Sequence, residues 1–336
     1  MKRCSMVIFL AAAFLVSPLA SISGAQTTLE KIKVGVPAFS LLQAPLYLAI
    51  DSGAFKKYGM DVSIVLLSGS LAIQGLVGNS VQFSQGVSSR TVPTAALAGA
   101  DVVLIAGFAD KLLFSLYSIP EIKSPEDLKG KIVGEDRPGA SDDFAVRAAL
   151  KHFGLVPGKD VTIRAMGGLP EVERALKIGA IHAGISNPPV SFLAEKDGLR
   201  QLLDLAALGF DYITSGLGVK RSTITTRRDM VKHFLMGMIE GVSILKTDKE
   251  FTLPVLAKYT KISDRKLIEQ SYNYVSPYFL KVPYPSLKAI KATLEVIAED
   301  IPKAKQARPE DFVDSSLLKE IEASGFIDKL YSNEQH

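Results

Sequence analysis

Short apolar runs, each closed by turn residues, recur along the first two thirds of the chain and alternate with stretches of helical periodicity. The apolar runs predict strands at residues 32–36, 61–67, 81–84, 102–108, 131–134, 161–166, 180–186 and 199–205. The intervening stretches predict helices at residues 45–52, 141–153, 170–178 and 188–196, with others opening near residue 70 and ending near residue 98. This alternation predicts an α/β fold in which mostly parallel sheets are covered by helices on both faces.

The pattern divides the chain into two α/β units followed by a helical tail. The second unit begins near Ile119 and Pro120, and its last predicted strand ends near Leu205. Beyond Lys220 the pattern is almost entirely helical, from residues 228–247 onward to about Leu330. The C-terminal third therefore adds helices to units that already contain the predicted strands.

The first 25 residues have the layout of a secretory signal peptide. Lys2 and Arg3 give a positive start, an apolar run covers residues 6–16, and Ser23-Gly24-Ala25 offers the small residues of a cleavage site. The apolar run is too short to span a bilayer permanently. We expect export to the periplasm, cleavage near Ala25 and a mature protein that begins near Gln26.

Composition and charge then narrow the classes of function. Cys4 is the single cysteine and lies before the apolar run, which is the wrong place for a lipid anchor, so the mature chain has no disulfide, catalytic thiol or thiolate metal site. Hydrophobic residues at 47% and charged residues at 22% are typical of a globular protein. Loss of Lys2 and Arg3 would lower the formal charge from +4, which leaves no case for nucleic acid or a membrane surface as partner.

Catalytic and metal-binding motifs are not found in the sequence. It contains no G-x-S-x-G elbow, no G-x-x-x-x-G-K-[ST] phosphate loop and no H-E-x-x-H zinc helix. The histidines are scattered without metal-ligand spacing, at His152, His182, His233 and His336. We therefore predict no catalytic residue, no metal and no cofactor.

Six short polar or glycine-containing loops, each expected to follow a strand, carry the candidate ligand-binding residues. Ligands of open α/β sheets bind beyond the carboxyl ends of strands, where loops and helix N-termini expose N–H groups. Turn and cap chemistry alone could explain any one loop, since Ser141 suits an N-cap and Asp142 a first helical turn. Six such loops in two units favour a shared cleft. The candidates are Phe39, Ser40, Gln43, Ser68, Gly69, Ser70, Gln85, Gly86, Ser88, Ala140, Ser141, Asp142, Gly168, Asn187 and Pro188.

Several stretches in the same order and spacing resemble one family. The second unit opens with SPEDLKGKIVG at residues 124–134, continues with GASDDF at 139–144, and reaches LKIGAIHAGIS at 176–186, followed by Pro188 and Pro189. Residues 240–247 and 303–313 fit as well. Together they resemble the nitrate/sulfonate/taurine-type substrate-binding proteins of ABC transporters, whose domain is related to the thiamine-pyrimidine-precursor synthases. His182 departs from the family pattern, where an aspartate is usual.

The resemblance implies a two-lobed periplasmic-binding-protein fold of type II with two crossovers and a helical C-terminal part. Lobe 1 would comprise residues 26–117 and 218–336, and lobe 2 residues 118–217. Hinges would lie at residues 115–119 and 213–219, where Gly216 and Gly218 give the backbone latitude.

The function implied by the resemblance is capture of a solute by hinge closure and delivery to a membrane permease driven by a cytoplasmic ATPase. The solute would be a small polar or organic-acid molecule of the nitrate, sulfonate or taurine class. The protein would be a monomer that touches a membrane protein only transiently. Two alternatives stay open: an enzyme of the pyrimidine-precursor synthase type, and a ligand-sensing module for a membrane receptor.

The charges near the loops do not fix the ligand. Asp142 and Asp143 would occupy the positive end of a helix and compete with an anionic ligand, or favour one with donor groups. Arg90 and Arg137 are candidate charge partners, although a solvated surface position is the simpler expectation for both. Phe39 could wall in a ligand or belong to the core.

Overall fold

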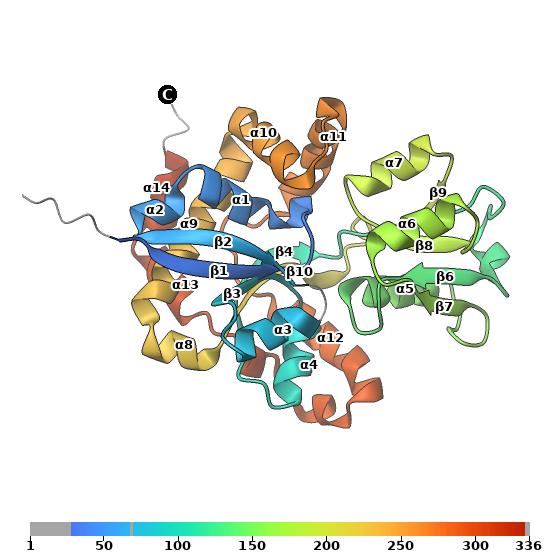
Figure 1. Cartoon of the computed structure of the whole chain (residues 1–336). Coiled ribbons are helices and arrows are strands. Elements are labelled where there is room, and N and C mark those ends of the chain that lie inside the picture. Colours follow the sequence, from blue (N-terminus) through green and yellow to red (C-terminus); the bar gives the residue numbers. More distant parts are fainter. Residues whose placement is uncertain (1–27, 68–69, 333–336) are drawn as a thin grey trace, which may run out of the picture.

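The computed structural model describes residues 28–67 and 70–332. It contains two five-stranded sheets, which Figure 1 shows side by side with their helices. The first sheet has the order β2-β1-β3-β10-β4, with β1 (Glu30–Val36), β2 (Met60–Leu66), β3 (Phe83–Val87), β4 (Val103–Lys111) and β10 (Asp211–Val219). The second has the order β7-β6-β8-β5-β9, with β5 (Ser115–Ser118), β6 (Ile132–Glu135), β7 (Thr162–Ala165), β8 (Ala183–Ser186) and β9 (Arg200–Asp204). The predicted signal peptide and its cleavage site lie outside the described residues.

Each sheet contains one strand that runs against the other four. In the first sheet β10 pairs antiparallel with both β3 and β4, and in the second β5 pairs antiparallel with both β8 and β9. The remaining pairs are parallel. The prediction of mostly parallel sheets is therefore confirmed for strand direction, and the reversed strands make both sheets mixed.

The reversed strands are the ones that arrive from the other sheet. The chain leaves β4 and crosses to β5 through residues 112–114, and it leaves β9 and returns to β10 through residues 205–210. The segments expected as hinges at 115–119 and 213–219 are therefore largely strand and adjoin these crossing segments. Their glycines have a packing role, since a methyl group built on Gly216 would lie 2.6 Å from the carbonyl oxygen of Val87.

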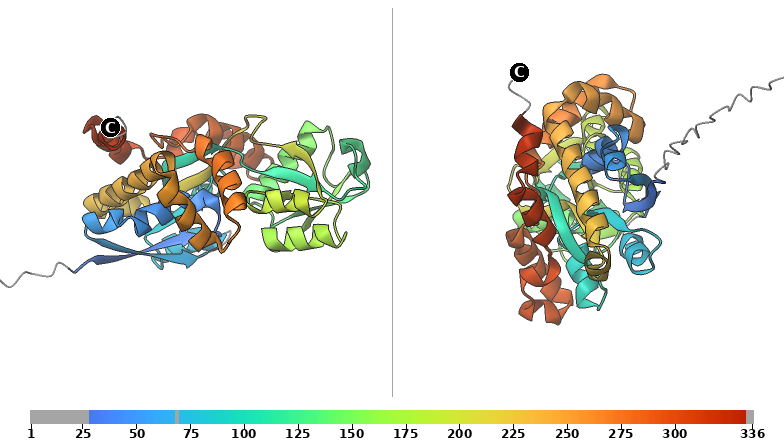
Figure 2. Two further views of the ribbon diagram at one scale, coloured as in Figure 1. Left: turned by 90° about the horizontal axis from the view of Figure 1, so that it is seen from above. Right: turned by 90° about the vertical axis from the view of Figure 1, so that its left-hand side faces the viewer.

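Helices cover both faces of the first sheet, as the two views of Figure 2 show. Along β4, Val103 and Ile105 point into one hydrophobic cluster and Leu104 into another on the opposite face. The larger cluster is covered by α1 (Ala44–Asp51), α2 (Ala54–Lys57), α8 (Arg221–Thr226), α9 (Arg228–Thr247), α10 (Lys249–Thr260), α11 (Arg265–Val275), α13 (Ser316–Ala323) and α14 (Phe326–Ser332). The opposite face is covered by α3 (Ser70–Val77), α4 (Thr91–Leu97) and α12 (Leu287–Asp300).

The second sheet repeats this arrangement on a smaller scale. Leu116 of β5 packs into a cluster with α5 (Ser141–His152), and the next residue, Tyr117, packs into a cluster with α6 (Leu169–Lys177) on the other face. The helix α7 (Val190–Lys196) contributes Ala194 to that second cluster. The α/β fold with two sheets and a helical C-terminal part is thus as predicted.

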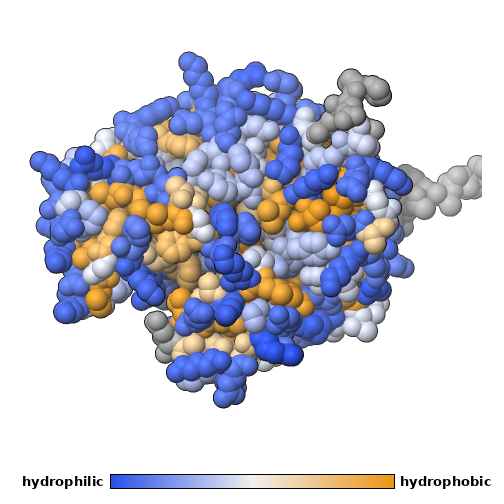
Figure 3. Space-filling model, turned by 180° about the vertical axis from the view of Figure 1, so that it is seen from behind, coloured by the Kyte–Doolittle hydropathy of each residue, from blue (hydrophilic) through white to orange (hydrophobic). Residues whose placement is uncertain are grey.

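No helix of the described residues combines the length and the hydropathy that a bilayer crossing requires. On the face drawn in Figure 3, hydrophobic residues form separate patches interrupted by hydrophilic ones.

Candidate functional site

In each sheet, four strands share one direction, and their carboxyl ends lie at the junction between the two sheets. The reversed strand β10 begins opposite Lys111, the last residue of β4, and β5 begins opposite Ser186 and Asp204, the last residues of β8 and β9. Because parallel strands end at one edge, the carboxyl ends of β1, β2, β3, β6, β7 and β8 face the same region, where the loops that follow them begin. These are the six loops that carry the predicted ligand-binding residues.

The loop after β1 uses its predicted residues to hold its own turn. Ser40 caps the short 3-10 helix η1 (Leu41–Gln43), and the Gln43 side chain accepts hydrogen bonds from the Ser40 backbone N–H at 3.3 Å and from its Oγ at 2.7 Å. Gly86 lies against this turn with φ at +89°, and a Cβ there would sit 2.7 Å from Gln43 Nε2. Ser40, Gln43 and Gly86 therefore have a structural role in docking η1.

Gln85 anchors the same turn from β3. Its Nε2 donates to the Leu42 carbonyl at 3.0 Å and to Ser215 Oγ at 2.9 Å. Its Oε1 is buried and has no hydrogen-bond partner in the structure. Phe39, in contrast, is 46% exposed and stacks at 6.4 Å on Tyr47. Phe39 thus rests on the core residue Tyr47 and leaves nearly half of its surface exposed.

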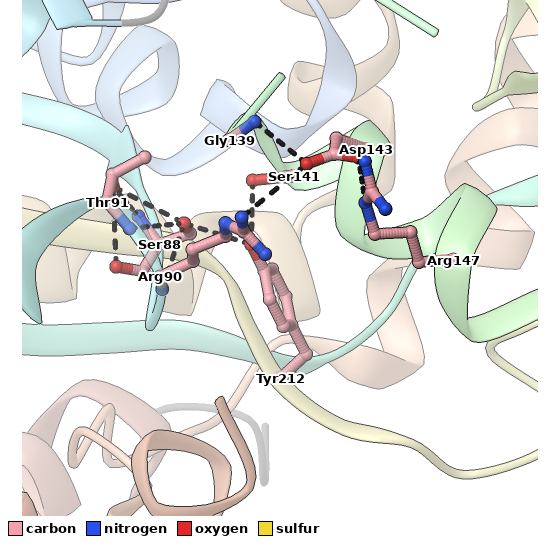
Figure 4. Close-up of polar contacts among 8 residues, drawn as sticks. All are labelled: Ser88, Arg90, Thr91, Gly139, Ser141, Asp143, Arg147 and Tyr212. Carbon is pink, nitrogen blue, oxygen red and sulfur yellow. Dashed lines mark hydrogen bonds and ion pairs between the residues drawn. The ribbon is translucent and has the colours of Figure 1, made fainter. Parts of the chain in front are cut away.

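One tyrosine connects the two sheets through hydroxyl contacts. Tyr212, near the start of β10, is fully buried, and its hydroxyl lies 3.0 Å from Ser88 Oγ after β3 and 3.1 Å from Ser141 Oγ at the start of α5. Figure 4 shows the tyrosine between the two serines. Burial raises the pKa of Tyr212 to about 12, so the phenol stays protonated. The structure therefore brings together Ser88 and Ser141, which the sequence placed on separate loops.

An ion pair runs beside this tyrosine. Arg90 Nη2 lies 3.6 Å from Asp143 Oδ2, and both residues are buried. Asp143 also accepts the Gly139 N–H at 2.8 Å and Arg147 Nε at 2.6 Å. The expectation that Arg90 is a solvated surface charge is therefore wrong, because the residue is only 8% exposed. Its Nη1 is buried without a hydrogen-bond partner.

Three carboxyl groups gather where β6 ends and α5 begins. Burial, followed by a hydrogen bond shared with Asp143, raises the pKa of Glu135 to about 8. Burial opposes ionisation of Asp143, but hydrogen bonds from Glu135, the Gly139 N–H and Arg147 outweigh it and lower its pKa. Burial also raises the pKa of Asp142 to about 6, although its side chain accepts a hydrogen bond from the Asp136 N–H. The Asp142 side chain thereby holds the loop that precedes its own helix.

The other predicted residues lie beside helix starts at the same junction. Ala140 and Gly168 precede α5 and α6, and Ser70 begins α3, while Ser68 and Gly69 lie outside the described residues. Asn187 and Pro188 follow β8 and are buried. Arg137 pairs with Asp136 at 3.1 Å and donates to the Gly167 carbonyl at 3.2 Å. The hydrogen bonds of the described residues do not join Gly168, Asn187 or Pro188 to Tyr212.

A second set of contacts across the junction was missed at the sequence level. Tyr274 of α11 donates to Asp204 Oδ1 at the end of β9 at 2.8 Å, and its ring meets Phe192 of α7 edge-on at 5.8 Å. Nearby, Lys196 lies 3.6 Å from Asp264. No motif marks these residues, and only their placement in the fold brings them together.

Two surface hollows lie away from the junction. One of about 510 Å³ is lined by Glu30, Tyr58 and His233 among others, and one of about 530 Å³ by Leu294, Ala304 and Arg308 among others. Neither contains a predicted site residue. Within the described part of the chain, no group of three or more His, Cys, Asp or Glu side chains is arranged so that it could hold a metal ion.

Comparison with known proteins agrees with this architecture. A curated ABC transporter periplasmic binding protein of Brachyspira hyodysenteriae is 24% identical over 348 residues, covering 94% of this chain and 97% of its own. Among solved structures, the periplasmic nitrate-binding protein NrtA of Synechocystis has a TM-score of 0.73 and 18% identity, over 90% of this chain and 91% of that one. The periplasmic aliphatic sulphonate-binding protein SsuA of Escherichia coli has a TM-score of 0.70 and 19% identity, over 86% and 99%. These likenesses confirm the periplasmic-binding-protein fold.

A match to a family model shows which protein family the chain belongs to. The model described as NMT1/THI5 like matches residues 42–249, which include all of the second sheet and most of the first. The chain belongs to the NMT1/THI5-like family.

Proposed function

We propose that this protein is the substrate-binding component of an ABC importer, exported to the periplasm, where it captures a small polar or organic-acid solute and delivers it to a permease. One observation carries the proposal: a relative named as an ABC transporter periplasmic binding protein matches the chain over almost its full length. The nitrate- and sulphonate-binding proteins among its structural neighbours make these anions and their taurine-like analogues the first solutes to test.

The proposed site is the junction of the two sheets, between a first lobe built on the sheet β2-β1-β3-β10-β4 and a second lobe built on the sheet β7-β6-β8-β5-β9. Closure would act through the crossing segments 112–114 and 205–210. Phe39, Gly168 and Asn187 are the proposed contacts to solute. The backbone N–H groups that open α5 and α6 would add donors to solute oxygens.

The enzyme alternative has less support. The curated relative and the two structural neighbours described above are named as binding proteins, and the sequence after residue 25 has no cysteine for a thiol mechanism. As a binding protein, the chain would neither transform its solute nor hydrolyse ATP. A sensing role would use the same solute site and would differ only in the membrane partner that reads the closed form.

Solute binding should raise the melting temperature of the mature protein. At a solute concentration about 100-fold above Kd, binding to the folded state alone adds about 2.7 kcal/mol to its stability. We expect such a rise with alkanesulfonates, taurine, nitrate or small carboxylates, measured by scanning fluorimetry and confirmed by titration calorimetry. Chromatography of the incubated solute supplies the control, since appearance of a product would support the enzyme alternative, and no response to any small solute would contradict the proposal.

Phe39→Ala should weaken solute binding by roughly threefold to tenfold, the range expected for loss of one aromatic contact. The side chain is 46% exposed, so its removal should leave the melting temperature of the unliganded protein almost unchanged. Ile178→Ala is the matched control, because Ile178 is 79% exposed and follows the end of α6 that points away from the junction. Equal affinities for Phe39→Ala and the unmodified protein would remove Phe39 from the site.

A further inference from the structure

We propose that Ser88, Arg90, Ser141, Asp143 and Tyr212 form a latch that holds the two lobes together before any solute binds. These residues would then set solute affinity through the equilibrium between open and closed forms, not by touching the solute. The part of this inference that concerns affinity rests on the proposed function, whereas the part that concerns lobe closure does not.

The latch joins the segment that follows β3 in the first sheet to the start of α5 on the second sheet. The crossing segments 112–114 and 205–210 would not by themselves hold these two parts together. Ser88 and Arg90 follow β3 in the first sheet, and Ser141 and Asp143 lie in the first turn of α5 on the second sheet. Tyr212 lies between them, just after the chain has returned from the second sheet. Figure 4 shows these five side chains converging from both sides of the junction.

Burial makes these contacts effective. Ser88 and Tyr212 are fully buried, and Asp143 is 1% and Arg90 8% exposed. Ser141 is half-buried. Water therefore does not compete for the contact between Tyr212 and Ser88, and the ion pair is screened much less than a surface pair. An exposed set of the same residues would contribute far less to holding the lobes together.

Each half of the latch keeps partners of its own when the lobes separate. Asp143 retains the Gly139 N–H and Arg147, so loss of Arg90 does not leave its charge unpaired. Ser88 Oγ still accepts the N–H groups of Arg90 and Thr91 at 3.3 and 3.2 Å. Arg90 and the Tyr212 hydroxyl would gain water. Because no buried charge is orphaned, opening is reversible at moderate cost.

The effect on solute follows from population arithmetic. If solute binds the closed form, the apparent Kd equals the intrinsic Kd divided by the closed fraction. A latch that closes the lobes in advance raises that fraction before solute arrives. Removal of one latch contact lowers the affinity by the factor by which it lowers the closed fraction.

Tyr212→Phe tests the latch because it removes one hydroxyl and leaves the ring that packs at 4.7 Å against Phe144. We expect a larger radius of gyration by small-angle X-ray scattering of the unliganded protein, and a larger one still for Tyr212→Phe combined with Arg90→Gln. Tyr117→Phe is the matched control, because the Tyr117 hydroxyl bonds Glu195 within the second lobe and should not affect closure. Circular dichroism verifies that each variant is folded.

The solute that raises the melting temperature provides the second readout. We expect Tyr212→Phe to weaken its binding by roughly threefold to tenfold, while saturating solute restores the radius of gyration of the unmodified protein. Weaker binding with an unchanged unliganded radius would make Tyr212 a direct solute contact and would overturn the latch. Unchanged radii in the double variant would overturn it as well. If no solute is found, the scattering comparison still decides the question while the proposed function fails alone.

Discussion

The free energy of unfolding should fall as the pH rises from about 5 to about 9, and Glu135→Gln should remove most of that fall. Glu135 is 2% exposed, and burial together with the hydrogen bond shared with Asp143 raises its pKa from 4.5 to about 8. The folded protein therefore holds a proton that the unfolded chain releases near pH 4.5. Stability from this group is complete below pH 4.5 and is lost as the pH rises toward 8.

The expected loss is large because each pKa unit corresponds to about 1.4 kcal/mol, so the fall is on the order of 4 kcal/mol. Asp142, whose pKa burial raises to about 6, adds a smaller fall that ends at lower pH. Asp143 acts in the opposite direction, but its lowered pKa confines its effect to acid below this range. The cations beside the pair are Arg90 and Arg147.

Urea denaturation at fixed pH values between 5 and 9 measures this profile. Glu135→Gln keeps the side-chain size and a hydrogen-bond donor while it removes the titration. Glu126→Gln is the control, because Glu126 is exposed and its pKa is lowered by hydrogen bonds with its own backbone and with Ser124. A profile that is equally steep in Glu135→Gln and in the unmodified protein would show that Glu135 is already ionised in the fold.

Most strands of the fold could be predicted from local patterns in the sequence. The periodicity of apolar residues located β1 to β4 and β6 to β9, because a buried strand between turn residues leaves a signal within a few positions. The reversed strands β5 and β10 left no such signal. Their residues are buried in the sheets as any strand is, and nothing local shows that they arrive from the other sheet.

The candidate site was predictable as a region but less so as a set of residues. The loops converge because of sheet topology, which strand order along the chain implies. Tyr212 and its partners Ser88 and Ser141 are 124 and 71 positions apart, so their contact could only emerge from the fold. Ser40 and Gln43 differ, since their S-x-x-Q spacing is that of a capping box, a local signal that their assignment as ligand-binding residues left unused.

Gly241→Ala should destabilise the protein by about 3–5 kcal/mol. Gly241 lies in α9 where this helix crosses α1, and a methyl group built there overlaps the carbonyl oxygen of Pro45. Backbone atoms in the middle of a packed core cannot move aside without displacing α1 and, with it, the adjoining η1 turn of the candidate site. The gain of about 1 kcal/mol in helix propensity from Gly to Ala is too small to compensate.

Gly237→Ala, one turn earlier in the same helix, is the matched control. It receives the same gain in helix propensity, but its methyl group would meet the ring of Phe55 at 2.5 Å, and a side chain can turn where a backbone cannot. We expect a loss of about 1–2 kcal/mol for Gly237→Ala and a clearly larger loss for Gly241→Ala, both measured by urea denaturation with the same slope. Equal losses would mean that α1 and α9 can separate freely, and that the core beneath the η1 turn does not fix the position of Phe39.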